Sequence, residues 1–432
     1  MGESCTCRSS RSFSWLVKSC LPDPTAASPG PRRPTSQRWF TSRDDPQPPP
    51  PGERRRHKSL DEPSLSSLPD DLLLECLSRV PTSSLPSLSV VCRRFSILLD
   101  SPDFFLRRRS HGLLRRTFLA LSISEAGLLV LSSSGDPPLA GATWTILPLP
   151  AGLSDGGSFS FSFCRFVPVG RSIFLLGRRS AICYDIWRGA AAPCAPTLFP
   201  RKKFAAAAIG GKIYVAGGST QTSAVEEYDP ATNAWKVVSE APRRRYGCLG
   251  AAADGVFFVI GGLKVAGRGE ARVDAYTYAG TMDLYDVQRR AWRRARAVPG
   301  GGCVVAACAA GDIVYALASH AVEVSFWRWE GGTAAKGGGG WARLPPPPVP
   351  PLARVARAGR FACIGFGAST VVLLVHISGG PSSAGAGDRR GASRSCDRER
   401  LLLVYDAVTG EWFPGAALPP ALSRVACVCV DC

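Results

Sequence analysis

Three stretches share a pattern that decides the fold: VEEYDPATNAW (225–235), MDLYDVQRRAW (282–292) and VYDAVTGEW (404–412). Each contains a Tyr-Asp pair, and a Trp follows seven residues after the Tyr. The residues are Tyr228, Asp229 and Trp235, then Tyr285, Asp286 and Trp292, then Tyr405, Asp406 and Trp412. A pattern that returns at long intervals is typical of repeat proteins, in which each copy is one supersecondary unit.

The stretch RKKFAAAAIGGKIYVAGGSTQTSAVEEYDPATNAWKVVSEAP (201–242) contains one complete unit. Its alternation of short apolar runs and turn residues predicts strands over 204–209, 212–216, 225–228 and 234–238. Glycine tolerates the positive φ of tight turns, so glycine pairs are expected between strands. These pairs are Gly210-Gly211, Gly217-Gly218 and, in the next unit, Gly261-Gly262.

Weaker copies bring the number of units to six over residues 118–432, a period near the ~50 residues of kelch blades. The Gly-Gly pairs, the Tyr-Asp pairs and the Trp residues resemble the kelch motif. The resemblance implies a mainly β protein, a six-bladed kelch-type β-propeller whose Tyr and Trp fill contacts between blades. The alternative, a Trp surface that stacks on a ligand, requires exposed rings.

The first unit, which begins at Phe118, lacks its opening strand, while RVACVCV (424–430) follows the last unit where a seventh would begin. We therefore expect residues 424–430 to complete the first blade and close the ring, which would remove the exposed sheet edges.

Before the repeats, LPDDLLLECLSRVPTSSLPSLSVVCRRFSILLDSPDFF (68–105) has apolar residues at helical spacing, with a break at Pro81 and Pro86. We expect Asp70 to cap the first helix. The order Leu-Pro, Leu-rich helix, Val-Pro and Val-Cys-Arg-Arg-Phe resembles the F-box, and predicts a small all-α domain over 63–112. The alternative is an ordinary helical hairpin packed on the rest of the chain.

Composition sets the remaining bounds. Residues 1–62 are rich in Ser, Pro and Arg and bury too little to fold, so they are expected to be a disordered tail. The run 54–58 is either a nuclear import signal or a solvated linker, and MGESCT matches a myristoylation pattern. The 16 Cys residues in so long a chain favour reduced thiols, hence the nucleus or cytoplasm, and the apolar runs are too short to cross a membrane.

Signatures of catalysis are weak. GLSDG (152–156) matches G-x-S-x-G but has no helix after it, and the C-x-C-x-x-C of Cys427, Cys429 and Cys432 lacks a fourth ligand. Only four His residues are present. We expect no enzyme activity, no metal and no cofactor; a propeller enzyme is the third hypothesis.

The F-box resemblance implies docking on a Skp-type adaptor of a cullin-RING ubiquitin ligase, with the propeller holding an unknown protein substrate. The expected adaptor contacts are Leu68, Pro69, Leu72, Leu73, Pro81, Leu85, Val91, Cys92 and Phe95.

The formal net charge of +18 suggests an acidic partner. Arg243, Arg244 and Arg245 are expected to form a basic substrate face with the arginines of 289–296. The alternative for these arginines is a solvated rim. The alternative for the whole chain is a kelch scaffold or a basic module associated with nucleic acid. Nucleic acid is not the expected partner.

Overall fold

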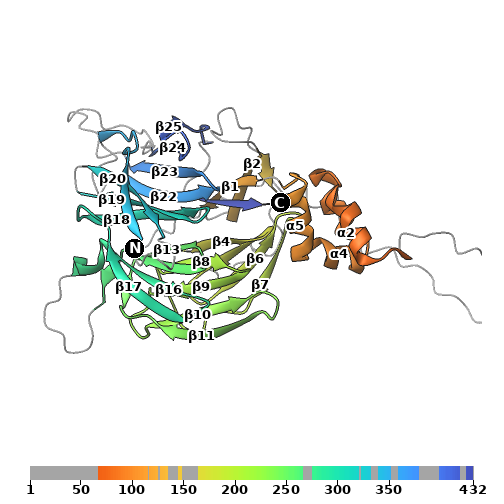
Figure 1. Cartoon of the computed structure of the whole chain (residues 1–432), viewed down its shortest axis with the longest axis horizontal. Helices are drawn as coiled ribbons and strands as arrows, with labels where there is room; N and C mark the ends of the chain where they lie inside the picture. The colour runs from red at the N-terminus through yellow and green to blue at the C-terminus, as the bar shows by residue number, and fades with distance from the viewer. Residues whose placement is uncertain are drawn as a thin grey trace, which may run out of the picture. The chain divides into compact units, whose positions relative to one another are not determined.

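The computed structural model describes residues 67–114, 116–124, 127–134, 145–147, 164–265, 275–320, 323–331, 339–351, 359–378, 398–418 and 425–431. All of them belong to one compact unit, Ser64–Cys432. Figure 1 shows a helical part beside a much larger part built of strands. The tail expected over 1–62, with its basic run and MGESCT, lies outside the described residues. None of the described helices is long and apolar enough to cross a membrane.

The helical part consists of α2 (Asp70–Ser78), the 3-10 turn η2 (Thr82–Ser84), α3 (Leu85–Leu88), α4 (Arg93–Leu99) and α5 (Pro102–Ser110). The expectation that Asp70 caps α2 is wrong, because the N-cap is Pro69 and Asp70 lies in the first turn. Cys92 and Ser101 cap α4 and α5, each accepting a hydrogen bond from a backbone N–H three residues on. The last helix therefore starts at Pro102, directly after its capping Ser101.

The chain after Arg116 forms six four-stranded antiparallel sheets within the described residues. The first three are β26-β1-β2-β3 (Val425–Asp431, Arg116–Ser124, Gly127–Ser134, Thr145–Leu147), β4 to β7 (Arg165–Val169, Ser172–Leu176, Ala181–Asp185, Ala190–Cys194) and β8 to β11 (Ala205–Ile209, Lys212–Ala216, Ala224–Asp229, Ala234–Glu240). The next three are β13-β14-β16-β17 (Leu249–Ala253, Val256–Ile260, Thr281–Asp286, Ala291–Ala297), β18 to β21 (Cys303–Ala310, Ile313–Ser319, Val324–Glu330, Gly340–Leu344) and β22 to β25 (Gly359–Phe366, Thr370–Ser378, Arg398–Asp406, Glu411–Pro414). A short pair, β12 (Arg245–Tyr246) with β15 (Leu263–Lys264), and the turn η3 (Ala275–Tyr278) accompany the fourth sheet.

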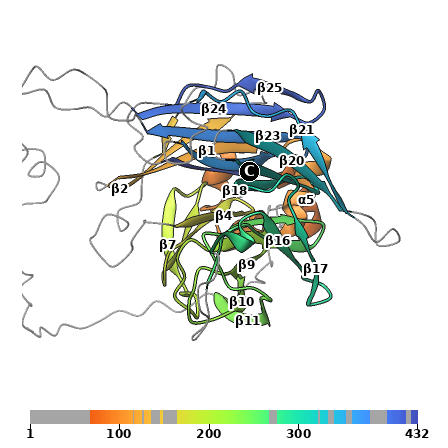
Figure 2. The same cartoon turned by 90° about the vertical axis from the view of Figure 1, so that its left-hand side faces the viewer.

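The sheets are the blades of a propeller. Each sheet's innermost strand contacts the next one around the ring, in the order β26, β4, β8, β13, β18, β22 and back to β26. In Figure 2, β4 and β18 lie centrally while the outer strands β11 and β25 lie at opposite edges. The ring closes because β26 pairs with β1 from Arg116↔Asp431 to Ser122↔Val425, so the last strand completes the first blade.

Small residues let the innermost strands approach closely. A Cβ on Gly250 of β13 would lie 2.4 Å from the carbonyl oxygen of Ala206 in β8, and one on Gly365 of β22 would lie 1.8 Å from that of Ala309 in β18. Such distances are far below van der Waals contact, so these two positions accept only glycine. The second strands supply the apolar bulk: all five residues of β14 are buried.

The seven-residue spacing of Tyr and Trp is a cross-strand pair. Tyr228 lies directly opposite Trp235 in the antiparallel ladder, with ring centroids 4.9 Å apart, and both rings are buried. The pairs at Tyr285 and Tyr405 have the same register and centroid distances of 5.1 Å. Each side chain therefore packs against the other across the turn.

The Asp after each Tyr begins that turn. The Oδ1 atoms of Asp229 and Asp406 each accept a hydrogen bond from the backbone N–H two residues on, at 3.0 and 2.9 Å. Asp286 accepts from Arg289 at 2.9 Å. A side-chain carboxylate that satisfies the turn's backbone is the ordinary use of Asp at this position. The residues that re-enter the next strand, such as Asn233, have positive φ.

Candidate functional site

The helical part presents apolar side chains to solvent. Val90, Val91, Ile97 and Leu72 have exposed fractions of 72, 64, 59 and 51%. Among the other expected adaptor contacts, Pro69, Pro81 and Cys92 are exposed and Leu68 is half-buried. Several large apolar side chains exposed on so small a domain favour a surface for another molecule. We call Leu72, Val90, Val91 and Ile97 the apolar face.

Arg94 joins the two segments that carry this face. Its Nε donates to Asp70 Oδ1 at 2.8 Å, and its Nη2 donates to the carbonyl oxygen of Leu68. Because Arg94 lies in the first turn of α4 and Asp70 in the first turn of α2, the Leu-Pro opening and the Val-Val-Cys segment lie near each other. The ion pair is partly exposed, so its role is to position the segments more than to stabilise the fold.

Two of the expected adaptor contacts are wrong. Leu73 is 2% exposed and Leu85 is 0% exposed. Both belong to a core cluster that also contains Leu119, Ile173 and other propeller residues, and Phe95 packs against the same cluster. In α2, Leu72 and Leu73 point in different directions, since neighbouring residues on a helix differ by about 100°. The helical periodicity identifies the apolar positions, but it does not tell which of them the rest of the chain buries.

Trp187, which fits none of the sequence patterns, anchors the helices on the second blade. The ring of the buried Phe104 meets it edge-to-face with centroids 6.1 Å apart, and the guanidinium of Arg171 lies 4.6 Å from its centroid. Arg171 pairs with Asp100 at the end of α4 and, at 3.0 Å, with Asp185 of β6. Trp187 follows Tyr184-Asp185 too closely to fit the repeat, and that displaced Trp was the available signal.

Arg108 closes the loop between α2 and α3 from inside. It is 1% exposed, and its guanidinium donates to the carbonyl oxygens of Val80 at 2.7 Å and Leu113 at 2.9 Å and to Thr82 Oγ1 at 2.8 Å. A buried guanidinium is tolerated only when such acceptors surround it. The Val-Pro break is thereby fixed to α5, which in turn packs on the propeller.

Glu75 is an ionic hub on the other side of α2. Arg79 Nη2 lies 2.6 Å and Arg107 Nη1 2.9 Å from its carboxylate, and His111 Nε2 lies 3.2 Å away. Hydrogen bonds from Arg79 and then from Arg107 lower the pKa of Glu75 to about 2. The hub connects α2 to α5, so the helices are joined to each other as well as packed on the propeller.

The kelch residues are structural. The indole N–H of Trp235 donates to the carbonyl oxygen of Ala195 at 2.8 Å, and the corresponding group of Trp412 donates to that of Pro345 at 2.9 Å, each acceptor belonging to the segment after the preceding blade. Trp292 does the same to Ser239 Oγ at 3.0 Å. Trp235 is 8% exposed, so a stacking surface for a ligand is excluded there.

The glycine pairs fall into two kinds. Gly210 and Gly211 need only their positive φ, since a Cβ would meet open space. Gly217 and Gly218 are also sterically required, because a Cβ would lie 2.7 Å from Cys248 Sγ in the first case and 2.7 Å from the carbonyl oxygen of Lys202 in the second. Gly261 and Gly262 are crowded in the same way, with backbone oxygens at 3.2 and 2.9 Å.

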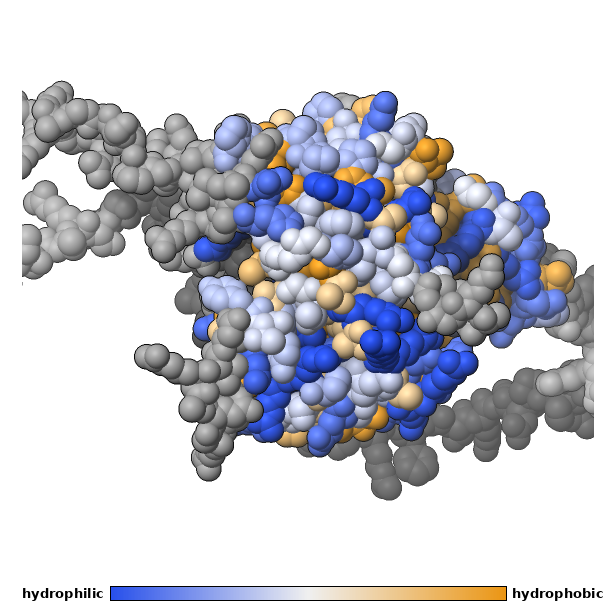
Figure 3. All heavy atoms as spheres, turned by 60° about the vertical axis from the view of Figure 1, so that its left-hand side comes forward, coloured by the Kyte–Doolittle hydropathy of each residue, from blue (hydrophilic) through white to orange (hydrophobic). Residues whose placement is uncertain are grey.

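The basic substrate face expected at Arg243, Arg244 and Arg245 is wrong for its last member. Arg245 is 0% exposed, and it donates to Asp283 Oδ2 at 2.8 Å and to the carbonyl oxygen of Gly261 at 2.8 Å. Arg243 also pairs with Asp283, while Arg244 is exposed. Figure 3 shows hydrophilic patches separated by less polar residues on the propeller surface.

A buried arginine at the same position of the repeat, which we call the internal arginine, also occurs in the third blade. Arg201 and Glu226 are both 0% exposed in their side chains and form an ion pair of 2.6 Å. Arg201 and Arg245 each precede the first residue of an inner strand by four positions. The third residue of the Arg run is thus a repeat element. Arg289 and Arg290 lie in the turn between β16 and β17. A basic zone shared by Arg243, Arg244 and the arginines of 289–296 stays a prediction.

Two family models and a relative by sequence agree with this architecture. The F-box domain family matches residues 65–107 and the Kelch motif family residues 200–242. An F-box/kelch-repeat protein of Arabidopsis thaliana is 44% identical over the full length of both chains. The F-box protein AFR of the same plant is 28% identical over 44% of this chain and 53% of its own. The solved structure of YjhT is similar at 16% identity and a TM-score of 0.44, over 60% of this chain and 85% of that one. The chain belongs to the F-box/kelch-repeat family.

Proposed function

We propose that this protein is the substrate-recognition subunit of a Skp-cullin-F-box ubiquitin ligase. The single observation that carries the proposal is the apolar face of Leu72, Val90, Val91 and Ile97, which is open to solvent on a helical domain matched by the F-box family. Burying such side chains on a partner is the main favourable term in docking. We propose the nucleus or cytoplasm as the place of action.

The attachment of the helices to the second blade supports an adaptor role. Trp187, Phe104 and the Arg171–Asp100 ion pair hold the helical domain against the propeller through a shared core. A substrate on the propeller would then stay at a restricted distance from whatever the helices bind. Ubiquitin transfer would gain from the raised effective concentration of substrate lysines, without catalytic groups in this chain.

The test is a binding measurement with a purified Skp-type adaptor. Leu72→Arg with Val91→Arg places two charges on the apolar face, and we expect affinity to fall by roughly a hundredfold or more, since buried apolar contacts of this size are worth ~2–4 kcal/mol. Val408→Arg is the matched control, because Val408 is 80% exposed on the β24–β25 turn of the propeller. Adaptor binding that is equal for both variants contradicts the proposal. Failure of the unaltered protein to bind any adaptor, with salt-sensitive retention on nucleic acid, would favour the scaffold hypothesis.

A further inference from the structure

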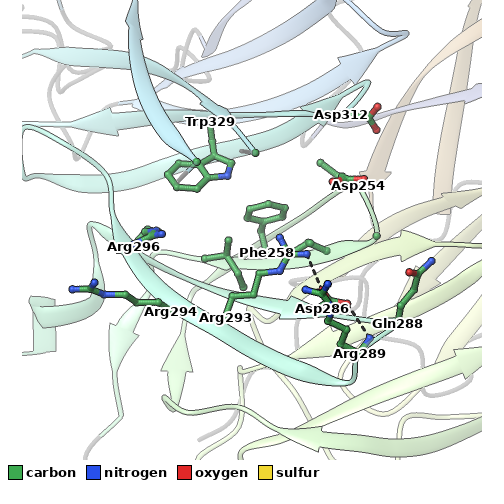
Figure 4. A pocket seen from close by; sticks show the side chains of 16 residues that line it. Asp254, Phe258, Asp286, Gln288, Arg289, Arg293, Arg294, Arg296, Asp312 and Trp329 are labelled. Atoms are coloured by element: carbon green, nitrogen blue, oxygen red, sulfur yellow. Dashed lines mark hydrogen bonds and ion pairs between the residues drawn. The ribbon is translucent and has the colours of Figure 1, made fainter. Parts of the chain in front are cut away.

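A cleft of about 590 Å³ separates the fourth and fifth blades, within the size range of ligand-binding sites. Its apolar floor includes Phe258 and Leu284 from the fourth blade and Trp329 from the fifth (Figure 4). It opens beside the β13–β14, β16–β17 and β18–β19 turns, where Asp254, Asp286 and Asp312 lie. None of these residues belongs to the apolar face of the helices or to the kelch Tyr–Trp pairs.

A β-bulge aims two arginines into this cleft. Leu284 pairs with Arg293 and Met282 with Arg296, so β17 has one more residue than β16 between these pairs. Without the bulge, Arg293 and Arg296 would point to opposite faces of the sheet, because their separation is odd. With it, both lie on the face of Met282 and Leu284, which faces the fifth blade in a common core. The third blade has a bulge at the same place, between Val225↔Ser239 and Glu227↔Lys236, so the bulge belongs to the repeat and the arginines on it are what the fourth blade adds.

The positive charge in the cleft is only partly neutralised. Arg293 Nη2 lies 2.7 Å from Asp286 Oδ2, and Arg289 Nη1 lies 3.9 Å from the same atom. Within the described residues, Arg294 and Arg296 have no acidic partner, although both line the cleft. The basic end of the cleft is therefore available to an external carboxylate.

The opposite end is acidic. Figure 4 places Asp254 and Asp312 together on the far side of Phe258 and Trp329 from Arg294 and Arg296. Neither aspartate has a basic partner among the residues that the structure describes. The cleft thus runs from a basic end across an apolar floor to an acidic end. A single small anion would satisfy only one of these three parts, whereas an extended peptide presents different side chains along its length.

The corresponding face of the third blade is closed. There Glu227 of β10 accepts hydrogen bonds from Tyr214 at 2.8 Å and Lys212 at 3.1 Å, and Lys236 lies 3.0 Å away. The ladder registers Tyr214 with Glu227 and Phe258 with Leu284, so the same two positions are polar in one blade and apolar in the next. The cleft arises from residues specific to the fourth blade.

We propose that the cleft between the fourth and fifth blades binds an extended segment of the protein substrate, with carboxylates at one end, an apolar side chain in the middle and a cationic side chain at the other end. The carboxylates lie against Arg294 and Arg296, the apolar side chain over Phe258 and Trp329, and the cation near Asp312. This site rests on the proposed function for calling the segment's owner a substrate.

A display library of short random peptides, selected on the full chain bound to its adaptor, tests the site. We expect the enriched peptides to carry Asp or Glu next to an apolar residue. Arg294→Glu with Arg296→Glu should lower their affinity at least about tenfold, as expected for loss of two charge-assisted contacts. The matched control is Arg178→Glu with Arg179→Glu, two exposed arginines of the β5–β6 connection outside the cleft. A selection on the Asp312→Lys variant should no longer enrich peptides with a cationic side chain at the end opposite the carboxylates.

The outcomes separate the two proposals. Enriched peptides without acidic residues, or equal loss in the Arg294/Arg296 and Arg178/Arg179 variants, overturn the cleft site. Adaptor affinity is measured on the same preparations, and none of these variants touches the apolar face. Loss of adaptor binding by the unaltered chain overturns the ligase role, yet peptide selection repeated on the chain alone would still test the cleft.

Discussion

The third and fourth blades have the same strands, registers and internal arginine, yet one has a closed face and the other borders a cleft. Lys212, Tyr214 and Glu227 in the third blade correspond by register to Val256, Phe258 and Leu284 in the fourth. The first set is linked by hydrogen bonds from Tyr214 and Lys212 to Glu227. The second set is apolar and offers no carboxylate, and Arg293 pairs with Asp286 instead. A repeat can therefore keep one packing face constant and vary the polarity of the other.

The largest effect should come from the element that both blades share. Glu226→Ala removes the partner of Arg201, whose side chain is fully buried, and leaves a guanidinium without its counter-charge. The free energy of unfolding should fall by about 3–5 kcal/mol, the usual cost of breaking a buried pair from one side. Urea unfolding of the full chain measures it. Glu240→Ala, at an exposed position of β11, is the control and should change stability by less than about 0.5 kcal/mol. A loss below 1 kcal/mol in Glu226→Ala would show that the internal arginine does not need its partner.

A second variant converts the fourth blade into the third. Val256→Lys with Phe258→Tyr and Leu284→Glu supplies the three groups that close the face of the third blade. Because the registers match, the new carboxylate can accept from the new Tyr and Lys, so we expect the fold to persist. It should lose about 2–3 kcal/mol of stability, because three buried side chains of the core shared with the fifth blade are replaced. Peptides selected on the cleft should bind this variant at least about tenfold more weakly.

The same graft without Leu284→Glu is its matched control, since it adds the hydroxyl and amine but no acceptor. It should lose more stability than the complete graft, because the buried hydroxyl then has no partner. Peptide binding that survives the complete graft would show that the floor of the cleft is not what the peptides contact.

Sequence patterns predicted the fold class for a clear reason. The spacing of Tyr228 and Trp235 is a local property, because it comes from two strands joined by one short turn. It can therefore be recognised from one sequence alone. Burial is not local. Leu72 and Leu73 are chemically equal, and only contacts with the propeller decide which of them stays exposed. Likewise Arg245 finds Asp283 38 residues away, so its run of arginines resembled a surface.

The cleft could not be predicted from the sequence, for a related reason. It depends on which side chains of the fourth blade share a face, and the one-residue register shift that decides this, present in the third blade as well, is not marked in the letters of MDLYDVQRRAW. The arginines of 289–296 are recognisable in the sequence as a group. The pairing of β16 with β17 is needed to decide which of them share a face. The structure is also needed to show that Arg294 and Arg296 lack acidic partners among the described residues.

The smallest effect concerns pH and the closed face of the third blade. Burial alone would raise the pKa of Glu227, but hydrogen bonds from Lys236, Tyr214 and Lys212 outweigh it and lower that pKa below the ordinary value. A carboxylate with a lowered pKa stabilises the folded state above its unfolded pKa of about 4.3, and this contribution is lost as the pH falls through the folded pKa. Glu227→Gln should therefore be less stable than the unaltered chain at pH 7 by at most about 1 kcal/mol, because both lysines are partly exposed to solvent. The gap should shrink as the pH falls below 4.5 and vanish at still lower pH, as measured by urea unfolding in a pH series. The fourth blade has Leu284 at this position and contributes no such gap, so a Leu284→Gln series should run parallel to the unaltered chain. A Glu227→Gln gap that stays constant with pH would mean that the carboxylate's charge is not what closes this face.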